Sequence, residues 1–403
     1  MLTDLSKNAE RFSLIVLIVL IMASLPVLAG RPPGHEPSRS FAGPSLAGLL
    51  VPPAEARVTR KAEGAEQSRA GGKPPNARSR FVPRTRVSIR EGRWYLNDRV
   101  TYPGTAAEGL LMNVRMVNAV FEDRNRSDFD PEANTDRFIA RIPEYVAQGV
   151  RGFTICLQGG MPGYEGALNS GFNPDGSLRQ SYLRRVRRVI EACDRHGAVV
   201  ILGLYYQRQD QVLADGDAVR AGVVNAARWI TDSGFANVVL EIANEFGHGG
   251  FDHRLLKTAE GMTNLIKLAK ATSPALLVST SGLGDGRSSD DVARASDFLL
   301  IHFNNTRLED IDARIAALRR FGKPIVCNED DKTGAEGARA LELSVDHGAS
   351  WGLMLVEVNQ HYPFTFEGAA DDPVIYAAMR RMTSIPQDNP IADGVLRPAE
   401  GPR

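Results

Sequence analysis

The stretch FANVVLEIANE, residues 235–245, decides the interpretation of this chain. It follows a turn signal at Ser233-Gly234, runs through a β-branched apolar core too short for a typical helix, and ends on Asn244 and Glu245. A buried parallel strand that delivers polar side chains to its carboxyl end has this pattern. We therefore interpret Glu245 as one half of a carboxylate pair whose other half lies elsewhere in the chain.

Seven further apolar runs alternate with amphipathic helical segments between residues 85 and 385. The expected strand cores are 109–114, 150–157, 198–205, 237–243, 275–280, 297–302, 323–328 and 350–356. Eight strands with helical crossovers close most simply as a (β/α)8 barrel, an α/β fold. A doubly wound open sheet is the alternative, but no glycine-rich phosphate loop follows the first strand.

The helical segments carry apolar stripes of helical period. Asn134-Thr135 is expected to cap the first helix, and Gly149 to end it. In the next helix, Arg184, Arg185, Arg187 and Arg188 are expected on a solvated outer face. Ahead of the barrel, residues 87–89 and 94–96 predict a β-hairpin that can plug its lower end.

The two ends of the chain differ from this domain. Residues 1–29 hold Lys7, Arg11 and a long apolar run, which predicts an export signal or, if it is not cleaved, a membrane tether. Residues 30–84 are rich in Pro, Gly, Ala and Arg and predict a disordered linker, and residues 386–403 predict a flexible tail. The sequence thus predicts a domain over 85–385 in an exported protein, at the cell surface, in the periplasm or outside the cell.

Composition excludes several classes of protein. Lys plus Arg and Asp plus Glu number 48 each among 403 residues, which gives no reason to expect a nucleic-acid partner. The three cysteines, Cys156, Cys193 and Cys327, have no metal-ligand spacing, and no disulfide framework is expected. We expect no cofactor. Oligomeric state cannot be inferred from these features.

In a (β/α)8 barrel the active site lies at the carboxyl ends of the strands. The polar residues expected there, besides Glu245 on strand four and Glu329 on strand seven, form a set suited to sugars. They are Asn113 and Arg115 (strand one), Gln158 (two), Tyr206 and Gln207 (three), Asn244 (four), His302 and Asn304 (six), and Asn359 and Tyr362 (eight).

Strand alternation places Glu241 below Glu245 on the same side, where a buried carboxylate needs a partner such as Arg115 or Arg151. It also places Ile325, Cys327 and Glu329 on one side of strand seven. Two glutamates about 5 Å apart across a barrel mouth can catalyse glycoside hydrolysis with retention of configuration, one as the nucleophile and the other as the acid/base.

Asn244-Glu245 on strand four and KPIVCNE at 323–329 resemble the clan A glycoside hydrolases, especially the cellulase-like family 5, and WYLNDRV at 94–100 is similar to the hairpin before their barrel. The resemblance implies a retaining mechanism on a carbohydrate substrate, with Glu245 as acid/base and Glu329 as nucleophile. His302 matches the sixth-strand histidine, but Asn304 stands where a tyrosine is usual, and no tryptophan lies near the end of strand eight.

Several alternatives stay open at this point. The two glutamates could be salt-bridged acids of an inactive, carbohydrate-binding barrel. His302 could contact substrate or be a structural imidazole. His248, Asp252 and His253 could suggest a metal, but the glycines around them favour a loop with a helix start at Asp252. Ser279-Thr280-Ser281-Gly282 lacks the pattern of a nucleophile elbow, so a serine hydrolase is a poor fit.

Overall fold

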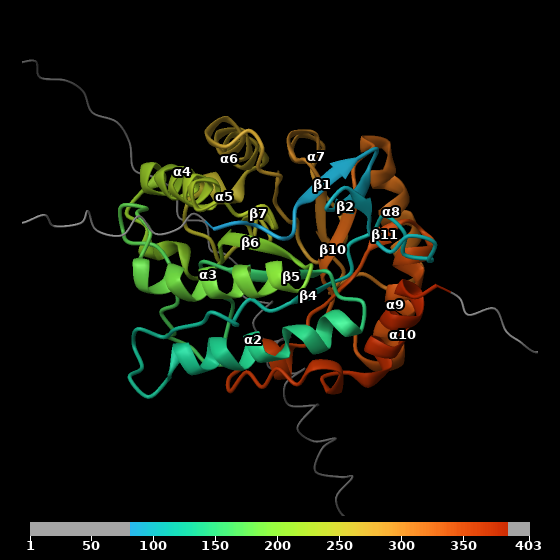
Figure 1. Cartoon of the computed structure of the whole chain (residues 1–403). Coiled ribbons are helices and arrows are strands. Elements are labelled where there is room, and N and C mark those ends of the chain that lie inside the picture. The colour runs from blue at the N-terminus through green and yellow to red at the C-terminus, as the bar shows by residue number, and fades with distance from the viewer. Residues whose placement is uncertain (1–80, 386–403) are drawn as a thin grey trace, which may run out of the picture. The chain divides into compact units, whose positions relative to one another are not determined.

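The computed structural model describes residues 81–385 (Figure 1). The expected export signal, linker and tail at 1–29, 30–84 and 386–403 lie outside these residues, except for Phe81 to Arg84 at the end of the linker. No helix within 81–385 is long and apolar enough to cross a bilayer.

Eight parallel strands, the eighth of which is split into β11 and β12, form a closed barrel. One sheet has the order β12-β4-β5-β6-β7-β8 and another the order β11-β10-β9. Parallel bridges from Ser281 to Leu300 and from Asp330 to Leu353 join the two sheets at both edges. The strands are β4(Asn113–Arg115), β5(Gly152–Cys156), β6(Val199–Tyr205), β7(Val238–Ala243), β8(Val278–Ser279), β9(Leu299–His302), β10(Ile325–Glu329), β11(Ala349–Ser350) and β12(Gly352–Leu353). The predicted (β/α)8 fold is confirmed.

Helices follow the strands and cover the outside of the barrel (Figure 1). They are α2(Pro131–Ala147), α3(Gln180–Arg195), α4(Gly216–Ser233), α5(Arg254–Lys257), α6(Ala259–Thr272), α7(Asp290–Ala295), α8(Ile311–Leu318), α9(Gly334–Asp346) and α10(Pro373–Thr383), with short turns η1(Asp210–Val212), η2(Leu308–Asp310), η3(Arg319–Phe321), η4(Val356–Gln360) and η5(Gly368–Ala370). Helix α5 begins two residues after the predicted start at Asp252.

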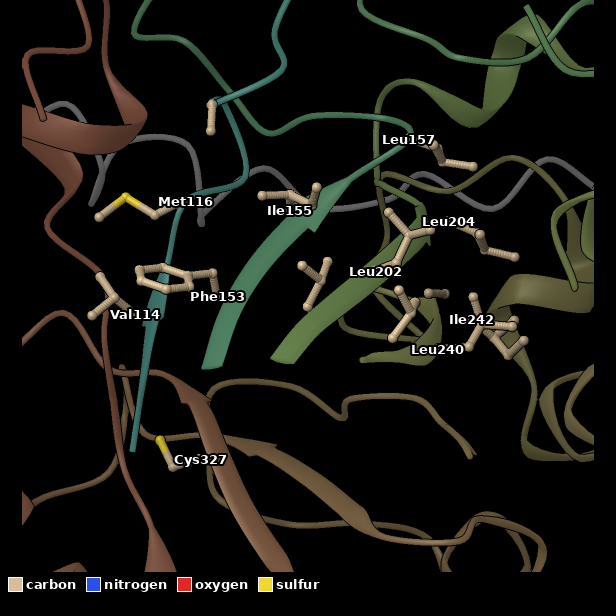
Figure 2. Packing of buried hydrophobic residues seen from close by; sticks show 14 of the residues in the cluster. Val114, Met116, Phe153, Ile155, Leu157, Leu202, Leu204, Leu240, Ile242 and Cys327 are labelled. Atoms are coloured by element: carbon tan, nitrogen blue, oxygen red, sulfur yellow. The ribbon is translucent and has the colours of Figure 1, made fainter. Parts of the chain in front are cut away.

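The outer core lies between the strands and these helices. Alternate strand residues such as Val114, Phe153, Leu202 and Leu240 form one continuous buried cluster with the apolar stripes of the helices (Figure 2). Cys327 belongs to this cluster as well. The three cysteines are free and buried, which is how a cysteine behaves as a small apolar residue.

The hairpin closes the lower end of the barrel as predicted. Strands β1(Val87–Arg90), β2(Arg93–Leu96) and β3(Arg99–Val100) form a separate antiparallel sheet. Trp94 is fully buried in an inner cluster with Leu111, Val199 and other inward residues at the starts of the strands, and its ring meets Phe298 edge to face at 5.2 Å. The plug leaves the carboxyl ends of the strands as the open end.

Two predicted strands differ from the observed ones. Strand β4 begins at Asn113 rather than Gly109, because Gly109 accepts a hydrogen bond from the Trp94 amide and so belongs to the plug. The eighth strand is split by Trp351 into β11 and β12, and Trp351 donates its indole N–H to Asp330 at 2.8 Å.

Helix α2 begins after Asp130, whose carboxylate caps the amides of Glu132 and Ala133. Asn134 and Thr135 lie one turn inside, where their side chains donate to backbone carbonyls of residues 118 and 119.

On α3, Arg185 is buried instead of solvated, since it pairs with the largely buried Glu122 at 2.6 Å.

Candidate active site

Glu245 reaches the barrel mouth through a strained backbone turn. Strand β7 ends at Ala243, and Glu245 has a φ of 51°, a left-handed conformation that costs a non-glycine residue on the order of 1–3 kcal/mol. Its amide donates to Ser281 Oγ at 2.9 Å, which holds the turn. Because this turn breaks the alternation of the strand, the consecutive side chains of Asn244 and Glu245 both hydrogen-bond to Gln207.

Glu329 reaches the mouth through an irregularity in β10. Cys327 pairs with Ile301, but the next pair joins Glu329 to His302, so Asn328 is skipped. Val326 lies in the inner cluster and Ile325 and Cys327 in the outer core. The prediction that Ile325, Cys327 and Glu329 share one side was therefore wrong, because it assumed unbroken alternation.

The two glutamates face each other at short range. One carboxylate oxygen of Glu245, one of Glu329 and a ring nitrogen of His302 all lie within 4.8 Å of one another. This upper bound is compatible with the roughly 5 Å between the carboxyl groups of retaining glycosidases and falls short of the roughly 6.5–9.5 Å of inverting ones.

Both oxygens of Glu329 have partners. The guanidinium Nε of Arg115 forms an ion pair with Oε2 at 2.7 Å, and Asn304 Nδ2 donates to Oε1 at 2.6 Å. The side chains of Arg115 and Glu329 are 0% and 5% exposed, so the ion pair is shielded from water. A carboxylate fixed between a cation and an amide in this way is rigidly positioned.

The partners of Glu245 form a second branch of the same network. His302 Nδ1 lies 3.1 Å from Oε1, and Gln207 Nε2 donates to Oε2 at 3.4 Å. Asn244 donates to Gln207 Oε1 at 3.1 Å and accepts from Arg115 Nη2 at 2.5 Å. Arg115 therefore links the two glutamates through Asn244 and Gln207.

The pKa values of His302 and Glu245 are shifted in opposite directions by their contact. Burial raises the pKa of Glu245, but the hydrogen bond and charge of His302, with smaller help from Arg115 and His248, outweigh burial and leave the pKa below its ordinary value. Burial lowers the pKa of His302, yet the charge of Glu329 and the bond to Glu245 leave it above its ordinary value. His302 is thus a buried imidazole tied to both carboxylates.

Glu241 lies below this network, as expected from alternation. It is fully buried, and Asn328 Nδ2 donates to its Oε2 at 3.2 Å. The charge of Glu241 helps to raise the pKa of Arg115, alongside that of Glu329. Arg151 instead donates to the carbonyls of Val146 and Val150, so of the two partners suggested by the sequence only Arg115 is near Glu241.

Glu245, His302 and Glu329 could offer three ligand atoms to a metal ion. The guanidinium of Arg115 already neutralises one of these carboxylates, which makes the cluster a poor cation site. In the loop after β7, His253 pairs with the buried Asp210 at 2.9 Å, and that carboxylate also accepts the amides of Asp252 and His253. These contacts anchor the loop.

Three residues predicted to bind substrate are engaged elsewhere. Asn113 is fully buried and donates to the carbonyls of Leu111 and Cys327. Gln158 donates to Ser170 and the Gln209 carbonyl and accepts the Tyr206 amide. Asn359, in the π-helical turn η4, is buried and donates to Asp371 at 3.3 Å. In all three residues the amide satisfies buried polar groups of the fold.

The remaining two predicted residues lie at different depths. Tyr206 is buried beside Cys156, close enough to Glu329 and Arg115 for their charges to act on its pKa, which burial raises. Tyr362 is 42% exposed, and the Arg126 guanidinium lies 4.8 Å from its ring centre. Tyr362 therefore belongs to an outer surface, and no contact joins it to the glutamates.

The sequence analysis gave no site role to Ser281, which follows β8 and holds the Glu245 turn. Ser281 directly follows a predicted strand, so the strand-end rule that found Glu245 could have found it. Asn328, the last residue of a predicted strand, donates to Glu241.

No protein-family model and no curated protein sequence matches the chain. Solved structures do match its fold. A candidate glycoside hydrolase from Bacteroides vulgatus aligns with a TM-score of 0.50 at 12% identity, covering 67% of this chain and only 54% of its own. A family 5 broad-specificity endoglucanase from Clostridium longisporum aligns at 0.50 and 10% identity, over 71% of this chain and 98% of its own.

An endo-1,4-β-mannanase from Rhizomucor miehei aligns at 0.51 and 12% identity, over 74% of this chain and 98% of its own. At such identity the likeness concerns the fold. The chain shares the barrel fold of these structures, and a three-stranded antiparallel sheet precedes its barrel.

Proposed function

We propose that this protein is an exported retaining glycoside hydrolase that cleaves β-glycosidic bonds in oligo- or polysaccharides. The observation that carries the proposal is the pair of glutamates, at the ends of strands four and seven, with carboxylate oxygens within 4.8 Å. The likeness of the fold to family 5 barrels supports it. The proposal of export rests only on the predicted export signal at residues 1–29. Cell fractionation that finds the protein in the cytoplasm would contradict export.

Glu329 suits the nucleophile, which must be ionised and held still. Arg115 supplies the compensating charge, and Asn304 fixes the other oxygen. In the first step a Glu329 oxygen attacks the anomeric carbon, and the bond to the leaving oxygen breaks as that oxygen takes a proton. The result is a covalent glycosyl–enzyme ester.

Glu245 suits the acid/base because its side chain is more open, at 13% exposed against 5% for Glu329. It gives its proton to the leaving oxygen and then accepts a proton from the water that hydrolyses the ester. Since its pKa lies below the ordinary value, the protonated form needed for the first step is populated at acidic pH. We therefore expect kcat/KM to be highest under acidic conditions.

Substitution of the nucleophile tests the proposal. Glu329→Gln should lower turnover by at least about 10³-fold, because no covalent ester forms, while the far-UV circular dichroism stays unchanged. Glu357→Gln is a matched control, since the Glu357 side chain is 83% exposed on η4. NMR of the first product from a β-glycan should show the β anomer.

An α anomer, or full activity in Glu329→Gln, would refute the mechanism. Sugar binding without hydrolysis across a broad β-glycan panel would instead identify a carbohydrate-binding barrel.

A further inference from the structure

Below the two proposed catalytic carboxylates, one hydrogen bond crosses the interior of the barrel. Asn328 Nδ2, on β10, donates to Glu241 Oε2, on β7, at 3.2 Å. Because β8 and β9 lie between β7 and β10 in the barrel, this bond does not join neighbouring strands. We call it the cross-barrel hydrogen bond. It connects the same two strands that deliver Glu245 and Glu329 to the mouth.

Each end of the cross-barrel hydrogen bond lies next to a proposed catalytic residue. Asn328 directly precedes Glu329 and is the residue skipped where the register of β10 shifts. Glu241 precedes Glu245 by four residues. An unpaired residue in a strand re-aims the side chains beside it. The bond to Glu241 therefore holds the residue whose skipped pairing turns Glu329 toward the mouth.

Neither of the two side chains has a second hydrogen bond within residues 81–385. Glu241 and Asn328 are both fully buried, and Glu241 Oε1 and Asn328 Oδ1 have no partner among these residues. The cross-barrel bond is thus the one hydrogen bond that orients either side chain in the described part of the chain. Its loss cannot be compensated by another bond of the same side chains.

Packing also restricts Glu241. Gly203, on the neighbouring strand β6, pairs with Glu241 in the sheet. A side chain at Gly203 would place its Cβ 2.6 Å from Cys156 Sγ and 3.7 Å from Glu241 Oε2, so only glycine fits without a shift of Cys156. The interior at this level is filled, which leaves Glu241 little room to move.

Stability gives no reason for a carboxylate at this position. An inner apolar cluster that includes Val239 lies directly below Glu241. Burying a carboxylate with one hydrogen bond costs more free energy than burying an apolar side chain of similar size. Arg115, whose pKa the charge of Glu241 helps to raise, offsets part of this cost. A polar pair where an apolar one would serve the fold indicates a role in the geometry of the site.

We propose that the cross-barrel hydrogen bond sets the separation of the Glu245 and Glu329 carboxylates. Glu241 and Asn328 are then positioning residues, which affect the reaction only through the two glutamates above them. The inference rests on the proposed function for the catalytic roles of Glu245 and Glu329. Without the bond, the carboxylates leave the separation of about 5 Å at which one can attack while the other transfers a proton.

The test replaces both partners with leucine, which is close in size to each. In the full-length Glu241→Leu/Asn328→Leu protein neither partner is left unpaired, so the melting temperature should equal or exceed that of the unsubstituted protein. Turnover of a β-glycan should nevertheless fall on the order of 10²-fold in kcat, because a misplacement of about 1 Å costs that much. KM should stay within about twofold, since the substrate contacts at the mouth are retained.

Two single variants serve as controls. Glu241→Gln keeps a side-chain oxygen that can accept from Asn328, so kcat should stay within about threefold of the unsubstituted protein. Asn237→Leu is matched to Asn328→Leu, because Asn237 is a fully buried asparagine directly before β7 and donates to the carbonyls of Ile190 and Ala198. Its loss should lower the melting temperature and leave kcat unchanged.

A measurement without substrate separates this inference from the proposed function. The NMR resonance of the Glu329 carboxyl carbon is identified by its absence from Glu329→Gln. It should shift in the double leucine variant and keep its position in Asn237→Leu. If the unsubstituted protein hydrolyses no β-glycan, the proposed function is refuted, and this resonance decides whether the cross-barrel bond positions Glu329.

Four results would overturn the inference. They are an unchanged kcat in the double leucine variant, an equal loss of kcat in Asn237→Leu, an equal loss in Glu241→Gln, and an unmoved Glu329 resonance. A double variant that melts well below the unsubstituted protein would also overturn it, because the pair would then serve the fold.

Discussion

Arg115 is the residue whose removal should have the largest effect on both stability and the site. Arg115→Met keeps most of the apolar stem but removes the guanidinium that contacts Glu329 at 2.7 Å and Asn244 at 2.5 Å. Glu329 then stays buried as an uncompensated charge, and breaking a buried pair from one side costs about 3–5 kcal/mol. The free energy of unfolding should fall by that amount at neutral pH.

A double-mutant cycle separates the ion pair from packing. In Glu329→Gln the buried charge is already absent, so adding Arg115→Met should cost about 2 kcal/mol less than it does in the parent. Urea unfolding followed by both fluorescence and circular dichroism measures each corner of the cycle. Arg187→Met on α3 is the control, since its pair with Glu191 is partly exposed and worth about 1 kcal/mol or less.

A loss below about 1 kcal/mol in Arg115→Met, or a coupling near zero, would refute this reasoning. The first result would mean that water or another group compensates Glu329, and the second that Arg115 acts only through packing.

Two further predictions concern the charge of the site. His302→Asn removes the partner that lowers the pKa of Glu245, so burial should raise that pKa. The alkaline limb of the kcat/KM profile should then move to higher pH. A limb that does not move would exclude Glu245 as the proton donor. The lowered pKa of Glu245 adds to the free energy of unfolding above the unfolded pKa of about 4.5, and the raised pKa of His302 adds to it below the unfolded pKa of about 6.5. His302→Asn should therefore lower the melting temperature most between these two pH values. A loss of melting temperature that does not depend on pH would contradict this linkage. Dialysis against a chelator should leave activity unchanged, because Arg115 already compensates the Glu245–His302–Glu329 cluster, and a loss restored by a divalent cation would show that this cluster holds a metal.

The sequence by itself determined the number and order of the strands and the lower plug. Buried parallel strands are short apolar runs bounded by turn signals, and this signal is local, so it survives without any knowledge of contacts. Glu245 and Glu329 were found for the same reason, since each is the polar residue at which such a run ends. That strands four and seven bring these ends together follows from closure of the barrel.

The tertiary structure decided which polar residues serve the site and which serve the fold. Asn113, Gln158 and Asn359 have the same chemistry as Asn244 and Gln207, and only the positions of neighbouring backbone groups and side chains show that the first three are engaged in structural hydrogen bonds. A buried amide binds whichever unsatisfied group lies nearest, and sequence spacing does not contain that information.

The same holds for the directions of the two glutamates. Alternation alone would have turned Glu329 to the side of Cys327, and the skipped pairing at Asn328 reversed it. Glu245 depends on a left-handed backbone that its own residue type disfavours and that the bond to Ser281 maintains. Local preference fixed where each strand ends, whereas long-range hydrogen bonds set the final geometry of the carboxylate pair.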